Sequence, residues 1–94
     1  MPYIKQEYRG KLDDAMGIVA SAMQAVPDDK QVGAWNYFIT QFFVSGMPKE
    51  FAYQYIVNVL GTLEAVKLEF YRRMAVPYED AKKEENGEVY PTGT

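Results

Sequence analysis

The sequence predicts an all-α fold, a small helical bundle in which two shorter helices pack on one long helix that leads into a bent, polar C-terminal helix. Apolar residues recur at spacings of three and four in three segments, which is the period of one helix face. Breaks that contain proline or glycine separate those segments. The 94 residues are enough for one domain with a modest core. We expect a single helical domain over residues 1–94, with its packed core at about 12–76, a polar helical extension at 77–87 and a loose tail at 88–94.

The first helix is expected to run to about residue 26, after a short helical turn at residues 5–10. Asp13 or Asp14 is placed to cap its N-terminus, and Pro27 follows its end. Its narrow apolar seam consists of Leu12, Met16, Val19, Met23 and Val26.

The second helix is expected over residues 31–44, with Asp28 or Asp29 as its cap. The spacing that predicts it joins Val32, Trp35, Ile39 and Phe42. Residues 37–40 are rich in β-formers, so a strand is the alternative. We favour the helix because the helical spacing continues on both sides of that run. The stretch Ser-Gly-Met-Pro at residues 45–48 ends it.

The third helix is expected over residues 48–75, which is roughly 28 residues or about 42 Å. Pro48 suits its first turn. Pro77 lacks an N–H group and disfavours helical geometry in the residue before it, so the helix should bend or restart there. A polar helix over 78–86 follows, and Gly87 is placed to cap it. A hairpin turn at 86–87 is the alternative, but no alternating strands flank it.

The long helix carries two apolar rows about 100° apart. The first, expected to face the core, is Ala52, Ile56, Val59, Leu63, Val66, Phe70 and Met74. The second is Tyr53, Val57, Leu60, Leu68, Tyr71 and Ala75. Two helices of about 20 Å each cannot cover both rows unless they pack end to end. We therefore expect a homodimer or a higher homo-oligomer; the alternative is that one chain covers both rows itself.

Glu64 interrupts the second row, and Lys67 lies between the rows. One interpretation is an ordinary ion pair three residues apart on the flank of the helix. The other is a charged pair inside an interface or pocket, where it fixes register or holds a ligand. The candidate interface or pocket residues are Tyr53, Val57, Leu60, Glu64, Lys67, Leu68 and Tyr71.

Arg72 and Arg73 are a candidate anion contact. Glu69 stands three and four residues before them, so solvated ion pairs are the simpler interpretation. Lys82 and Lys83 extend the patch toward a nucleic-acid accessory role, but the acidic residues around them dilute it. A net charge of −3 also disfavours nucleic acid as a partner.

Composition removes most catalytic chemistry, since the chain has no cysteine and no histidine. We predict no catalytic residues, no cofactor and no metal ligand. A carboxylate-and-metal nucleotide hydrolase is the alternative, although the sole Glu-x-x-Glu spacing, Glu85 to Glu88, straddles Asn86-Gly87. The first residues contain no signal-peptide core, and the longest apolar run, residues 37–44, is too short to span a bilayer. We expect a cytoplasmic protein with no membrane partner.

Several stretches of the chain are similar to a known family. The longest reads Leu60-Gly61-x-Leu63-Glu64-x-x-Lys67-Leu68-Glu69-Phe70-Tyr71-Arg72-Arg73. The others are Met-Pro-Tyr-Ile-Lys at the start, Asn-Tyr-x-Ile-Thr at 36–40, Pro-Tyr-Glu-Asp-x-Lys at 77–82 and Asn-Gly-Glu-Val-Tyr at 86–90. The sequence resembles a family of short, functionally uncharacterised proteins encoded in bacteriophage and bacterial genomes. The resemblance implies a phage-linked or bacterial cytosolic context, and it implies no reaction.

Overall fold

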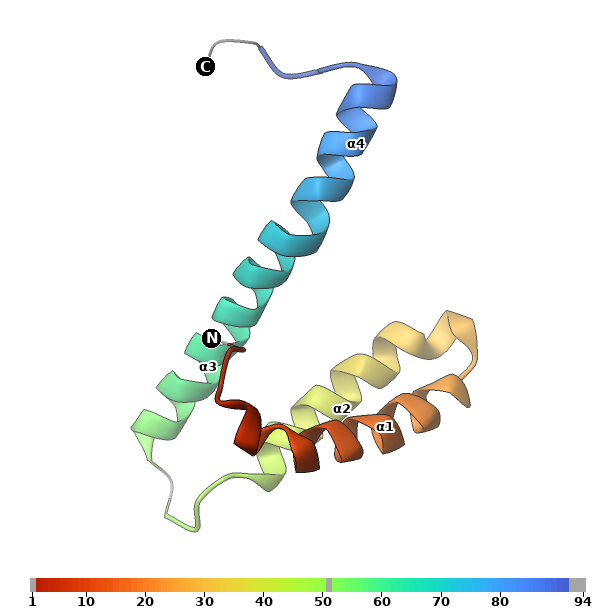
Figure 1. Cartoon of the computed structure of the whole chain (residues 1–94). Helices are drawn as coiled ribbons and strands as arrows, with labels where there is room; N and C mark the ends of the chain where they lie inside the picture. The colour runs from red at the N-terminus through yellow and green to blue at the C-terminus, as the bar shows by residue number, and fades with distance from the viewer. Residues whose placement is uncertain (1, 51, 92–94) are drawn as a thin grey trace. The chain divides into compact units, whose positions relative to one another are not determined.

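The computed structural model describes residues 2–50 and 52–91, and every regular element within them is helical (Figure 1). The predicted all-α class is confirmed. The chain divides into two units, Met1–Val59 and Leu60–Thr94. The long helix begins in the first unit and continues into the second.

The first unit begins with the 3-10 turn η1 (Gln6–Tyr8), which leads into helix α1 (Gly10–Gln24). The short turn expected at 5–10 is confirmed. The predicted cap is wrong, because α1 starts before Asp13, and Arg9 at the cap position makes no side-chain capping bond. The preceding turn explains the early start: the N–H of Arg9 already donates to the carbonyl of Gln6 at 2.9 Å.

Between α1 and α2 lies the 3-10 turn η2 (Asp28–Lys30), and Figure 1 shows the chain reversing direction there. Helix α2 (Gln31–Ser45) follows with Lys30 at its cap position and no capping side chain, so a cap by Asp28 or Asp29 was wrong. The Gln31 amide instead closes the end of α1. Its Nε2 donates to the carbonyls of Met23 at 2.7 Å and Val26 at 2.8 Å.

Helix α2 includes residues 37–40, so the strand alternative is wrong. The half-buried side of this helix differs from the row that predicted it. Ala34 and Phe38, four residues apart, are partly covered, whereas the row of Val32, Trp35, Ile39 and Phe42 is exposed. On α1, the predicted seam is half-buried toward its end and exposed at Leu12 and Met16.

Helix α3 (Tyr53–Phe70) starts five residues later than the sequence predicted, because Pro48 belongs to the loop after α2. A start at Pro48 would leave only Gly46 and Met47 to turn the chain. The longer loop lets the Tyr55 hydroxyl donate a hydrogen bond to the carbonyl of Phe43 at the end of α2. A Cβ on Gly46 would lie 3.0 Å from that hydroxyl, so a larger residue would crowd the contact.

The second unit contains the rest of α3, then the π-helical turn η3 (Tyr71–Ala75) and helix α4 (Val76–Asn86). The whole of α3, η3 and α4 follow one another without a break as one bent helix of 34 residues. The predicted bend or restart near Pro77 is confirmed: the helix passes through the π turn and continues as α4 from Val76. Gly87 ends α4 with φ of 95° and its N–H on the carbonyl of Lys83 at 2.8 Å, which confirms the predicted cap.

None of the described residues is buried. The most covered side chains in each unit are partly exposed, among them Val19, Met23 and Phe38 in the first. A single helical domain over residues 1–94, with its packed core at about 12–76, stays a prediction.

Candidate functional site

The candidate interface residues lie on one continuous stretch of helix, all of them on α3 except Tyr71, which begins η3. We call this set the interface row: Tyr53, Val57, Leu60, Glu64, Lys67, Leu68 and Tyr71. Its five apolar or aromatic members are 42% to 77% exposed. A contiguous apolar row on the surface of a helix is one kind of surface that binds another protein. The row expected to face the core is exposed as well, since Leu63, Val66, Phe70 and Met74 are 37% to 65% exposed.

Glu64 and Lys67 form a loose ion pair in the middle of the interface row. The Lys67 Nζ lies 4.0 Å from Glu64 Oε1, and the two side chains are 74% and 59% exposed. Exposed pairs of this kind contribute about 0–1 kcal/mol, so the contact within the chain holds neither side chain firmly. Both charges are therefore accessible to groups outside the helix.

The candidate anion contact is occupied by an acidic side chain of the same helix. Arg72 Nη2 donates to Glu69 Oε2 at 2.8 Å and to Oε1 at 3.0 Å. Arg73 Nε lies 3.6 Å from the same Oε1. This matches the simpler interpretation of solvated ion pairs. An anion at this position would have to compete with the carboxylate of Glu69.

The two lysines that would extend a basic patch also have acidic neighbours. Lys82 lies 3.4 Å from Glu85, and Lys83 lies 3.6 Å from Glu88. The Lys82 ammonium is also 5.7 Å from the ring centre of Tyr78. These pairs neutralise the charge that a phosphate backbone would require.

The π turn places Glu79 on the same face as Tyr71, eight residues earlier. In a regular α-helix, residues eight apart are turned by about 80° and residues seven apart share a face. The wider turn of η3 takes up one extra residue, and the Tyr71 hydroxyl hydrogen-bonds the Glu79 carboxylate. That bond and the negative charge of Glu79 raise the pKa of Tyr71 above its usual 10.0. Constant helical periodicity would have aligned Tyr78 with Tyr71 instead.

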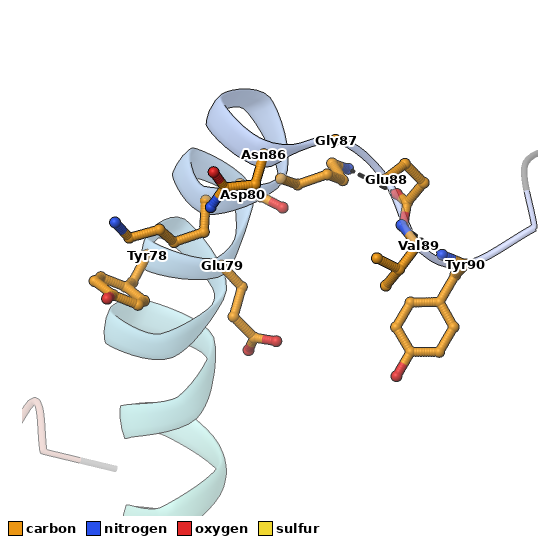
Figure 2. Close-up of a pocket in the computed structure, with 10 residues that line it drawn as sticks. Tyr78, Glu79, Asp80, Asn86, Gly87, Glu88, Val89 and Tyr90 are labelled. Atoms are coloured by element: carbon orange, nitrogen blue, oxygen red, sulfur yellow. Dashed lines mark hydrogen bonds and ion pairs between the residues drawn. The ribbon is translucent and has the colours of Figure 1, made fainter.

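The chain after α4 folds around the carboxylate of Glu88 (Figure 2). Its Oε1 accepts the N–H groups of Val89 at 2.9 Å and Tyr90 at 2.8 Å, and Lys83 approaches its other oxygen. The bond from the Tyr90 N–H, the charge of Lys83 and the bond from Val89 hold the pKa of Glu88 below its usual 4.5. The sequence predicted a loose tail here and gave no role to Glu88. The feature that could have indicated these contacts is an acidic residue directly after the glycine that caps the helix.

A shallow, open hollow of about 450 Å³ lies between α4 and this folded segment. Glu79, Val89 and Tyr90 lie on one side of α4, and Tyr78 lies on the other (Figure 2). The hollow is lined by residues 78–80, 82–83 and 86–90. Lys83 and Glu88, which both line the hollow, form an ion pair with each other. Their charges are therefore already paired within the chain.

Within residues 2–50 and 52–91, no three acidic side chains gather closely enough to hold a metal ion. No helix among these residues is both long enough and apolar enough to cross a membrane.

A family model described as "Domain of unknown function (DUF6899)" matches residues 1–89. The chain belongs to this family. No curated protein and no solved structure shows significant similarity to it. The expectation of a functionally uncharacterised family is confirmed at this level, and the phage or bacterial origin stays a prediction.

Proposed function

We propose that the chain is a small, non-enzymatic helical interaction protein of phage or bacterial origin that works in the cytoplasm by self-associating through the interface row. One observation carries the proposal. The apolar members of that row recur at helical spacing along α3 and are 42% to 77% exposed. Water contact over such a stripe is unfavourable, and a second copy of the same helix supplies a matching apolar surface.

The free energy available from burying this row is of the order that association costs. Full burial of a Val or Leu side chain is worth about 1.5–3 kcal/mol. Two copies bring ten apolar side chains together, and removing half of their exposed area is comparable with the cost of association, about 4–15 kcal/mol. Among these ten side chains, Tyr53 and Tyr71 each carry a hydroxyl that can remain in water.

The solution mass of the full chain at micromolar concentration tests the proposal. We expect a dimer or a higher oligomer by sedimentation equilibrium. Leu60→Glu places a charge in the row and should shift the protein toward monomer. Thr62→Glu, on the polar side of the same helix, is the matched control and should leave the mass unchanged. A wild-type chain that stays strictly monomeric would overturn the proposal.

A further inference from the structure

The stretch of helix from Leu60 to Tyr71 carries a repeat that is symmetric about its own centre. Its members follow one another at alternating spacings of three and four residues, the pattern of a coiled-coil seam. They are Leu60, Glu64, Lys67 and Tyr71. The outer two are apolar or aromatic and 54% to 61% exposed, and the central two are the exposed ion pair. The seam is thus apolar at both ends and charged in the middle.

From this symmetry we infer that two copies of the chain pair antiparallel along this seam, about a two-fold axis between Glu64 and Lys67. This inference rests on the self-association proposed above and specifies its partner and register. In a two-fold interface every contact occurs twice: if residue i of one copy contacts residue j of the other, then residue j of the first copy contacts residue i of the second. With the axis at this point, Glu64 meets the partner's Lys67, and Lys67 meets the partner's Glu64.

The same register pairs the apolar positions with one another. Leu60 meets the partner's Tyr71, and Tyr71 meets the partner's Leu60. The charges therefore fall opposite charges and the apolar groups opposite apolar groups over the whole seam. No second register places both kinds of group this way, because moving one helix by a turn sets Glu64 or Lys67 against an apolar side chain, and burying an unpaired charge is costly.

A parallel pair in register is disfavoured by the central charges. In that arrangement each residue meets its own copy, so Glu64 would face the partner's Glu64 and Lys67 the partner's Lys67. Two like charges at close range repel, most strongly where water is excluded. Glu64 and Lys67 thus select both the orientation and the register, as single polar positions do in coiled coils. Their loose contact within the chain, at 4.0 Å, leaves them able to pair across the axis.

Charge exchange in the full chain tests this register. Glu64→Lys alone sets two lysines against each other across the axis, and Lys67→Glu alone sets two glutamates. Each should weaken association about tenfold or more by sedimentation equilibrium. The double exchange Glu64→Lys with Lys67→Glu restores opposite charges and should recover wild-type affinity. Lys11→Glu, on α1, controls for the change in net charge and should have no effect.

Cysteine cross-linking provides an independent measurement, since the chain has no native cysteine. Leu60→Cys and Tyr71→Cys variants, mixed in equal amounts and oxidised, should form a disulfide-linked dimer of the two variants. Each variant oxidised alone should form little. Efficient linkage of Leu60→Cys to itself, or a double exchange that stays as weak as the single ones, would overturn the antiparallel register and leave self-association standing. A monomeric wild-type chain would overturn both.

Discussion

The Tyr55 hydroxyl donates a hydrogen bond to the carbonyl of Phe43 across the loop between α2 and α3. Both residues belong to the first unit, so this bond fixes how the start of α3 returns to the end of α2. Gly46 lies next to this bond, and a Cβ added there would be 3.0 Å from the Tyr55 hydroxyl oxygen, which is closer than side chains normally pack. The bond and the glycine therefore act together, which makes their coupling measurable.

Tyr55→Phe should destabilise the chain by about 0.5–1.5 kcal/mol, the usual value of one such hydrogen bond. Gly46→Ala should also destabilise it in the wild-type background, because the new methyl group crowds the hydroxyl. In the Tyr55→Phe background that crowding is gone, so Gly46→Ala should cost less. Urea unfolding at one fixed protein concentration gives the four free energies of this cycle. Simple additivity of the two substitutions would contradict the close contact.

Gln31→Leu should destabilise the junction of α1 and α2. The Gln31 amide donates to two carbonyls at the end of α1, and the leucine leaves both without this donor. We expect a loss of about 1–2 kcal/mol in the free energy of unfolding. Gln41→Leu, an exposed position on the same helix, is the control and should change stability by less than about 0.5 kcal/mol. Equal effects of the two substitutions would show that the paired carbonyls do not depend on Gln31.

Glu79→Gln should lower the pKa of the Tyr71 phenol toward 10.0, since it removes the negative charge that opposes phenolate formation. Because the folded-state pKa is raised, the stabilisation by this bond is complete below pH 10.0 and is lost as pH rises through the folded-state pKa. Tyrosine-labelled NMR spectra, with Tyr71→Phe to assign the signal, follow this titration. Glu84→Gln is the control for the loss of one negative charge. An unchanged Tyr71 titration in Glu79→Gln would contradict the alignment of these residues by the π turn.

Acid should release the segment after Gly87. The pKa of Glu88 is lowered in the folded chain, so its stabilising contacts are complete above pH 4.5 and are lost as pH falls through the folded-state value. The amide signals of Val89 and Tyr90 should move together with the protonation of Glu88. In Glu88→Ala both amides should exchange with solvent faster at neutral pH, whereas Glu85→Ala should leave them unchanged. Amide signals that do not respond to either change would show that the carboxylate does not hold this segment.

Periodicity was a good guide to which segments are helical and a poor guide to their ends. The second helix was placed to within one residue at its C-terminus, because its break at Gly46 is encoded locally. The aspartates were misleading as caps, because a 3-10 turn, η1 or η2, precedes each helix and puts Arg9 or Lys30 at its cap position. A capping pattern cannot indicate whether the preceding residues already form a turn.

The candidate site was predictable where its residues follow regular α-helical spacing, and unpredictable where the π turn interrupts that spacing. Six of the seven residues of the interface row lie in the regular part of α3, and their spacing follows directly from it. The partnership of Tyr71 with Glu79 does not, since it requires a π turn that no residue pattern announces. Pro77 marked the position of the irregularity but not its form. Similarly, the contacts of Glu88 depend on the conformation of Gly87, which sets the direction in which the chain leaves α4.

The π turn also bears on how much insertion or deletion this helix tolerates. A chain one residue shorter between Tyr71 and Ala75 could close the turn into regular α-helix and still present every residue of α4 on its present face. The same deletion within α3 would rotate everything beyond it by about 100° and break the alignment of the apolar positions. Length variation among relatives should therefore be concentrated in this five-residue turn and absent from the eighteen residues before it.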